Sequence, residues 1–256
     1  MAPDPFEGGQ PPAPPTLADL RFSDLLLALV VGLGITVLAG VLALALVQAT
    51  GLLGAGGPPD SQLLIVIALL VQAAGLLGAI YLFAVRRRRI PWAEFGLRPL
   101  SRGWLVRAVA IALIAFVLAS LFNYGVQSLM EQPPHNPQLD LIAPDGFSWG
   151  RLLVTLIFFG AVAPFTEEMF FRGLIYGWLR RRVSVWLAAG VSGLGFAVLH
   201  GIWWLIPALF LLGVTLALIY ERSGSIWASV VTHGLFNSLT TVLYYLALAT
   251  GTDLPT

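Results

Sequence analysis

The sequence predicts an all-α fold, a polytopic bundle of transmembrane helices, and both its composition and its patterning support this. Hydrophobic residues make up 58% of the chain and charged residues only 11%, with a mean hydropathy of +0.86. Soluble domains carry about 25% charged residues, so this composition excludes an ordinary soluble domain. Apolar runs recur along the 256 residues. They suffice for about seven spans of about 20 residues each, within a range of about six to eight.

The apolar runs follow an N-terminal stretch of different character. Residues 1–20 are expected to form a disordered cytoplasmic tail, because proline and glycine are frequent there and apolar side chains are too few to pack. Residues 21–150 are expected to hold the N-terminal transmembrane helices and one long loop at 132–146, which is rich in Pro, Asn and Asp. The seven spans are predicted at residues 25–49, 63–85, 106–127, 152–179, 185–199, 205–220 and 226–249.

The arginines predict how the bundle is oriented. All 14 basic residues are arginine, a usage typical of GC-rich bacterial genomes, so we expect an integral protein of the bacterial inner (plasma) membrane. In an alternating seven-span arrangement, Arg151 lies on one side and Arg172 lies within the membrane. The other side holds the remaining arginines, residues 21, 86–89, 98, 102, 107, 180–182 and 222. By the positive-inside rule that side is cytoplasmic, and it includes the N-terminus.

Composition also limits the partners. The net charge of +1 gives no basis for binding a nucleic acid, and none is expected. The absence of cysteine excludes disulfides and cysteine chemistry. The lipid bilayer is the one partner that the composition requires.

The fourth span contains charged residues that are expensive in a bilayer, which usually marks a functional site. Glu168 and Arg172 are four residues apart on one helix face, so we expect a bidentate ion pair between them. Glu167 points about 100° away and remains available to take and return a proton. Pro164 cannot donate to the carbonyl of Gly160, so it should kink the span and open room for water.

Two later spans each add a polar pair at helical spacing. His233 and Asn237 share one face of the last span and resemble a clamp for an oxyanion. Phe196 lies one turn before His200, so the ring could wall a cavity into which the imidazole reaches. Three polar stations on three helices suggest one site. Three glycines in the fifth span are expected to allow close helix approach: Gly190, Gly193 and Gly195.

Other interpretations remain open for these residues. The Glu–Arg pair alone could join two helices, His200 could be a satisfied helix-end histidine, and His233 with Asn237 could be an interhelical hydrogen-bond pair. A proton-coupled transporter would also need buried carboxylates and histidines, but it should show internal repeats, and the charged motifs occur only after residue 160. A third class is a non-catalytic membrane partner or bacteriocin immunity protein whose motifs serve structure.

The order of the three motifs resembles a known family. The motifs are Glu167-Glu168-x-x-x-Arg172, Phe196-x-x-x-His200 and His233-x-x-x-Asn237. This series resembles that of the CPBP family, also called the Abi family. The family comprises the type II CAAX prenyl endopeptidases and related bacteriocin-processing and immunity proteins. The resemblance covers about residues 152–246 and includes the segment 220–227.

The resemblance implies an intramembrane endopeptidase with its catalytic core at 151–250, in the last four spans. Glu167 would activate a water with help from His200, while His233 and Asn237 would steady the tetrahedral oxyanion. Three further residues would have supporting roles: Glu168, Arg172 and Phe196.

The resemblance leaves the cofactor and the substrate open. Glu167, His200 and His233 are also a plausible zinc set, with water as the fourth ligand. The sequence has no zincin-like His-Glu-x-x-His signature, so we expect no obligate metal, with zinc as the alternative. The expected substrate is a membrane-anchored or hydrophobic peptide, such as a CAAX-type tail or a bacterial peptide.

Overall fold

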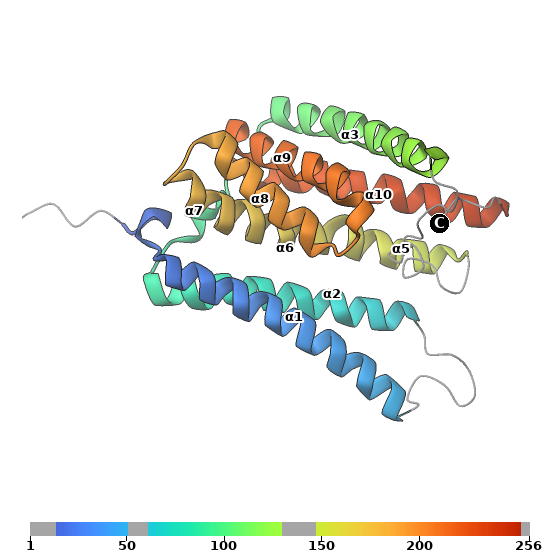
Figure 1. Cartoon of the computed structure of the whole chain (residues 1–256), viewed down its shortest axis with the longest axis horizontal. Helices are drawn as coiled ribbons and strands as arrows, with labels where there is room; N and C mark the ends of the chain where they lie inside the picture. Colours follow the sequence, from blue (N-terminus) through green and yellow to red (C-terminus); the bar gives the residue numbers. More distant parts are fainter. Residues whose placement is uncertain (1–13, 51–60, 130–146, 252–256) are drawn as a thin grey trace, which may run out of the picture.

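The computed structural model describes residues 14–50, 61–129 and 147–251, and within these ranges all regular secondary structure is helical. Figure 1 shows the long helices lying side by side along one direction. They are α1 (Phe22–Thr50), α2 (Ser61–Ile80), α3 (Arg102–Leu129), a central helix running through α5, α6 and α7, α8 (Val185–Leu199), α9 (Ile206–Ser223) and α10 (Ile226–Thr250). The predicted all-α helical bundle is confirmed.

Hydropathy separates these helices into two groups. Four of the described helices are long and apolar enough to cross a membrane: Gln62–Arg86, Arg102–Val126, Trp149–Arg180 and Trp203–Ser223. The apolar helices Phe22–Leu38 and Val185–Leu199 are shorter, and α10 carries His233, Asn237 and several threonines. The seven predicted spans agree with the observed helices within about four residues at each end, once the π-helical segment Tyr81–Arg86 that continues α2 is included. The predicted loop at 132–146 lies outside the described residues.

The central helix, Trp149–Arg180, divides the bundle into two parts. The hairpin of α1 and α2 packs against one side of it, whereas α10 packs against the other side and is covered by α3 and α9 (Figure 1). The central helix is not regular. It consists of α5 (Trp149–Ile157), a π-helical segment (Phe158–Val162), α6 (Ala163–Glu168), a second π-helical segment (Met169–Tyr176) and α7 (Gly177–Arg180). Such widened turns occur frequently at functional sites.

Glycines set the closest helix crossings. A Cβ added at Gly234 of α10 would collide with the backbone oxygen of Gly160 in the first π-helical segment. A Cβ at Gly213 of α9 would lie 2.8 Å from the Cα of Gly193 in α8. Gly193 therefore allows the close approach that the sequence predicts. The prediction was wrong for Gly190 and Gly195, because a Cβ on either would meet nothing within 4 Å.

The predicted tail is too long at its C-terminal end. Residues 1–13 lie outside the described structure, but Leu17 and Leu20 are both 1% exposed, within a short capped turn. Trp178 donates from Nε1 to the carbonyl of Leu20 at 2.7 Å, and Arg182 donates to the carbonyls of Ala18 and Leu20 at 2.9 Å. These partners come from the end of the central helix, some 160 residues away. Local composition alone therefore does not reveal the packing.

Candidate functional site

Glu168 and Arg172 form the predicted ion pair, and both side chains are 0% exposed. Arg172 donates from Nη1 to Glu168 Oε1 at 2.8 Å and from Nη2 to the carbonyl of Gly213 at 3.0 Å. The guanidinium also lies 4.6 Å from the centroid of the Phe196 ring, in the arrangement of a cation–π contact. The predicted bidentate geometry was wrong. Arg172 directs Nη2 to a backbone oxygen of α9, and Glu168 Oε2 has no hydrogen-bond partner in the described part of the chain.

His233 connects the two glutamates. It is 2% exposed, and its Nδ1 donates to Glu168 Oε1 at 2.9 Å, because a carboxylate can only accept. Its other ring nitrogen, Nε2, lies 3.9 Å from Glu167 Oε2. This distance is too long for a direct hydrogen bond, and it is one across which a single water can bridge.

Glu167 has a partner that the sequence interpretation missed. Gln72 of α2 donates from Nε2 to Glu167 Oε1 at 3.0 Å, and the glutamate side chain is 14% exposed. The two carboxylate oxygens therefore have different neighbours, an amide at Oε1 and an imidazole near Oε2. The signal that could have found Gln72 is an amide in the middle of an otherwise apolar span, where a polar side chain needs a partner.

Phe196 lies between the two histidines. It is fully buried, with its ring centroid 4.5 Å from that of His200 and 5.4 Å from that of His233. His200 caps the C-terminus of α8 and donates from Nδ1 to the carbonyl of Phe196 at 2.8 Å, which leaves Nε2 without a proton in the neutral ring. The structure brings His200 to the same aromatic ring as His233. Within the described residues, however, His200 forms no hydrogen bond or ion pair with Glu167.

Asn237 binds a carbonyl that the central helix leaves unpaired. In the first π-helical segment, the N–H of Ala163 reaches back five residues to the carbonyl of Phe158. The same spacing would pair residue 164 with Phe159, but Pro164 has no N–H. Asn237 instead donates from Nδ2 to the Phe159 carbonyl at 3.0 Å. One of its two N–H groups remains for another acceptor.

The charges of this cluster do not balance unless one of the glutamates or His233 carries an extra proton. Two carboxylates, on Glu167 and Glu168, lie near one guanidinium, that of Arg172. A proton on both nitrogens of His233 would make the cluster neutral, and it would give Nε2 an N–H directed toward Glu167. Neutrality matters here because an uncompensated charge in a buried site is strongly unfavourable.

The three residues of the alternative zinc set, Glu167, His200 and His233, do not converge on one point in this structure. A zinc ion needs its nitrogen and oxygen ligands at about 2.0–2.2 Å, so three ligand atoms must converge on one point. Within the described residues, no three His, Asp or Glu side chains are placed so that they could hold a metal ion. Glu167 and His233 approach each other, whereas His200 is held to the backbone of its own helix.

An apolar groove of about 690 Å³ lies beside the site, on the flank of the bundle. It is bounded by α3, the first π-helical segment and α10, and the rings of Phe165 and Trp227 stack at 5.4 Å along it. Its lining includes Gly160 and Gly234, the glycines of the crossing next to His233. The groove therefore passes close to His233, the residue before Gly234. The predicted catalytic side chains do not line it.

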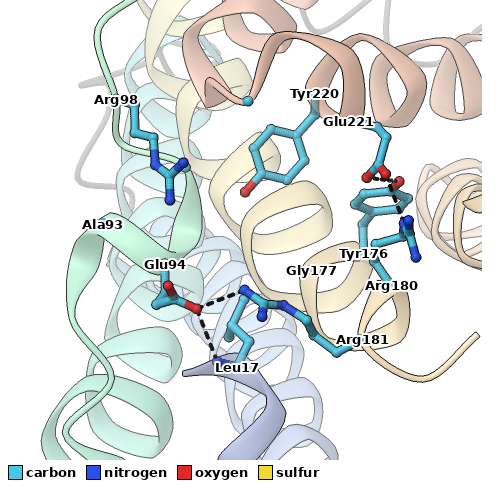
Figure 2. Close-up of a pocket in the computed structure, with 12 residues that line it drawn as sticks. Leu17, Ala93, Glu94, Arg98, Tyr176, Gly177, Arg180, Arg181, Tyr220 and Glu221 are labelled. Carbon is cyan, nitrogen blue, oxygen red and sulfur yellow. Dashed lines mark hydrogen bonds and ion pairs between the residues drawn. The ribbon is translucent and has the colours of Figure 1, made fainter. Parts of the chain in front are cut away.

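A second, smaller cavity of about 180 Å³ lies at the end of the bundle where arginines gather. Figure 2 shows Arg181 paired with Glu94, and Glu221 accepting from both Tyr176 and Arg180. These contacts join the ends of α7 and α9 to the segment before α3. The predicted site residues do not line this cavity, so we interpret it as part of the structure of that end.

Comparison with protein families places part of the chain in a known family model. A family model described as type II CAAX prenyl endopeptidase Rce1-like matches residues 148–239. The matched segment contains the central helix, α8, α9 and the part of α10 that carries His233 and Asn237. It does not include α2, from which Gln72 comes. No solved structure matches the chain significantly.

Three curated proteins are similar to the chain. YdiL of Bacillus subtilis (strain 168), named as a membrane peptidase, is 24% identical over 145 residues, 56% of this chain and 57% of that protein. The membrane-embedded CAAX protease MroQ of Staphylococcus aureus (strain USA300) is 25% identical over 149 residues, 56% and 58%. A 24.3 kDa protein of Escherichia coli, whose name assigns no function, is 30% identical over 160 residues, 59% and 69%. The chain thus spans little more than half the length of the first two relatives.

Proposed function

Because this chain belongs to the Rce1-like family of type II CAAX prenyl endopeptidases, we propose that it is an intramembrane endopeptidase. It hydrolyses a peptide bond in a membrane-anchored or hydrophobic peptide, and Glu167 activates the water. The names of the relatives MroQ and YdiL support a peptidase. We further propose that it resides in the bacterial plasma membrane with its N-terminus and arginine-rich end in the cytoplasm, in line with the positive-inside rule.

One observation carries the proposal, the 3.9 Å separation between Glu167 Oε2 and His233 Nε2. A water in this gap would contact a carboxylate that can accept its proton. Hydrogen bonds fix the positions of both groups that border this gap. Gln72 binds the other oxygen of Glu167, and Glu168 binds the other nitrogen of His233. Such preorganisation supports general base catalysis, which contributes about 10²- to 10⁴-fold.

The reaction that fits these groups is direct attack by water on the peptide carbonyl. Glu167 removes one proton as the water oxygen bonds to the carbonyl carbon, which gives a tetrahedral oxyanion. The carbon–nitrogen bond then breaks, and Glu167 returns the proton to the leaving amine nitrogen. No covalent intermediate with the protein is required.

We assign the oxyanion to donors on α10. His233, when protonated at both nitrogens, offers Nε2–H, and Asn237 keeps one N–H after its bond to Phe159. Each preorganised donor of this kind contributes roughly 3–4 kcal/mol to the stability of the transition state. His200 presents an unprotonated Nε2 in its neutral form, and we assign it a helping role in orienting the water.

The test is the Glu167→Gln variant in proteoliposomes, with two probes, a prenylated CAAX-type peptide and an unlipidated single-span peptide. We expect at least about a 100-fold loss of cleavage, because the amide cannot take up the proton. Thermal unfolding in detergent should stay near that of the wild type, which shows that the variant is folded. Retained cleavage would remove Glu167 from the role of base.

The same preparation separates the other classes of function. Cleavage of neither probe by the wild type would favour a non-catalytic membrane partner. Proton-driven uptake into sealed liposomes would favour a transporter. Metal analysis of active protein, with chelation and zinc re-addition, tests the zinc alternative directly.

A further inference from the structure

The N-terminal hairpin contributes a residue to the proposed site, although the family match begins only at residue 148. We propose that Gln72 of α2 is a positioning residue for Glu167. It holds one carboxylate oxygen so that the other faces the water and His233. This inference rests on the proposed function and extends it to a part of the chain to which no motif assigns a role.

Gln72 occupies a position on α2 that would ordinarily be apolar. Leu76 and Ala79, four and seven residues further on, lie on the same helix face and are 2% and 1% exposed. An amide on this inward face is partly buried and loses part of its hydration, which is costly unless it finds a hydrogen-bond partner. Its partner is the Oε1 atom of Glu167 at 3.0 Å.

The hairpin fixes the rotation of α2, so this contact is not left to a mobile helix. Gly75 lies one turn after Gln72, and a Cβ there would be 3.0 Å from the carbonyl oxygen of Gly32 in α1. A Cβ on Gly32 would in turn be 3.4 Å from the ring of Phe170 in the central helix. The two hairpin helices and the central helix are therefore packed tightly within a few residues of the Gln72–Glu167 bond.

The contact selects which oxygen of Glu167 acts as the base. With Oε1 held by the amide, Oε2 is the oxygen that lies 3.9 Å from His233 Nε2. The hydrogen bond also stabilises the ionised carboxylate, because the amide N–H donates to the charged form. Among the described residues, the charged or titratable groups close to Glu167 are His233 of α10 and, on its own helix, Glu168 and Arg172. The α2 helix contributes the uncharged Gln72.

Two variants and one matched control test this inference. Gln72→Leu removes the hydrogen-bond donor and puts an apolar side chain of similar size in its place. Gln72→Glu keeps the size but replaces the amide with a second carboxyl group. Gln62→Leu is the control, because Gln62 is an amide on the same helix that binds the Arg151 carbonyl and Thr155, away from Glu167.

Gln72→Leu should lower kcat by about 10- to 100-fold, the effect of losing a hydrogen bond to a charged group. KM should change by less than about threefold, because Gln72 touches the base and not the peptide. The Gln62→Leu control should retain the wild-type kcat and pH profile per folded molecule.

Gln72→Glu keeps the inference testable even where the leucine variant folds poorly. Two carboxyl groups in contact share one proton, so cleavage should fall more steeply with rising pH than in the wild type. At acid pH the protonated carboxyl group at position 72 can donate to Glu167 Oε1 as the amide does, so kcat there should exceed that of Gln72→Leu, a gain that a purely structural amide would not give.

The outcomes separate this inference from the proposed function. Wild-type kcat and an unchanged pH profile in either Gln72 variant, with Glu167→Gln inactive, would overturn the role of Gln72 and leave the peptidase standing. Absence of cleavage by the wild type would overturn both.

Discussion

Two ion-pair networks of the same residue types lie in different surroundings, one inside the bundle and one at its arginine-rich end. Glu168 and Arg172 are 2.8 Å apart and both 0% exposed, whereas Glu94 and Arg181 are 3.0 Å apart and 18% and 45% exposed. The distances are nearly equal, so they do not tell the networks apart. A buried ion loses several kcal/mol of hydration, to order of magnitude, while an exposed pair contributes about 0–1 kcal/mol. Burial makes the inner network a requirement for folding and for the site.

The largest expected effect on stability comes from Arg172→Met in the inner network. It leaves Glu168 buried without its cation, and we expect a loss of about 3–5 kcal/mol in the free energy of unfolding. Denaturation in detergent monitored by circular dichroism measures this loss. Cleavage should also fall, because Glu168 is the group that holds His233 Nδ1.

The double variant Arg172→Met with Glu168→Leu sharpens the result. Replacing both charged partners with apolar residues removes the unpaired charge, so most of the lost stability should return. Cleavage should stay low, since His233 then lacks its acceptor. A double variant as unstable as the single one would show that shape, and not charge, dominates at this position.

A smaller loss of stability is expected from a substitution at the crossing of α10 with the central helix, next to the inner network. Gly234→Ala places a methyl group against the backbone oxygen of Gly160, so α10 must shift next to His233 and Asn237. We expect about 1–3 kcal/mol of destabilisation, the usual cost of overpacking. Gly190→Ala is the matched control, because its methyl group would meet nothing within 4 Å and should not destabilise the protein. Equal melting temperatures for the two variants would contradict the proposed clash.

The outer network should give the smallest effect. Glu94→Gln removes the ion pair with Arg181 in partly exposed surroundings, so the expected loss is at most about 1 kcal/mol. The difference from the wild type should shrink further in high salt, which screens exposed charges. A loss approaching that of Arg172→Met would mean that the two networks are not distinguished by burial. Thermal unfolding at two salt concentrations measures both quantities.

Sequence periodicity predicted the helices and the inner ion pair well, because both follow from local rules. Apolar runs of known length give the spans, and the i, i+4 spacing gives the contact of Glu168 with Arg172. The second acceptor of Arg172, the carbonyl of Gly213, depends on how α9 crosses α8. No local rule supplies that crossing, which is why the bidentate geometry was wrong.

The contacts that define the candidate site were also beyond local rules. His233 binds Glu168 and Gln72 binds Glu167 only because three helices are rotated toward one another. The predicted tail erred for the same reason, since Leu17 and Leu20 pack against the distant Trp178 region. The roles assigned to Glu167, His200, His233 and Asn237 remain predictions that cleavage assays test.

The first π-helical segment makes the residue spacing of the central helix part of its function. A π-helical turn holds more residues than an α-helical turn, so removing one residue between Phe158 and Val162 would return the segment toward a regular α-helix and change the pairing of the Ala163 N–H with the Phe158 carbonyl. The widened turn that holds Gly160 against α10 would be lost while every span kept its hydrophobicity. A one-residue deletion in this segment should therefore alter the site. Among aligned relatives, a one-residue gap here would mark chains that share the composition but not the geometry of the site.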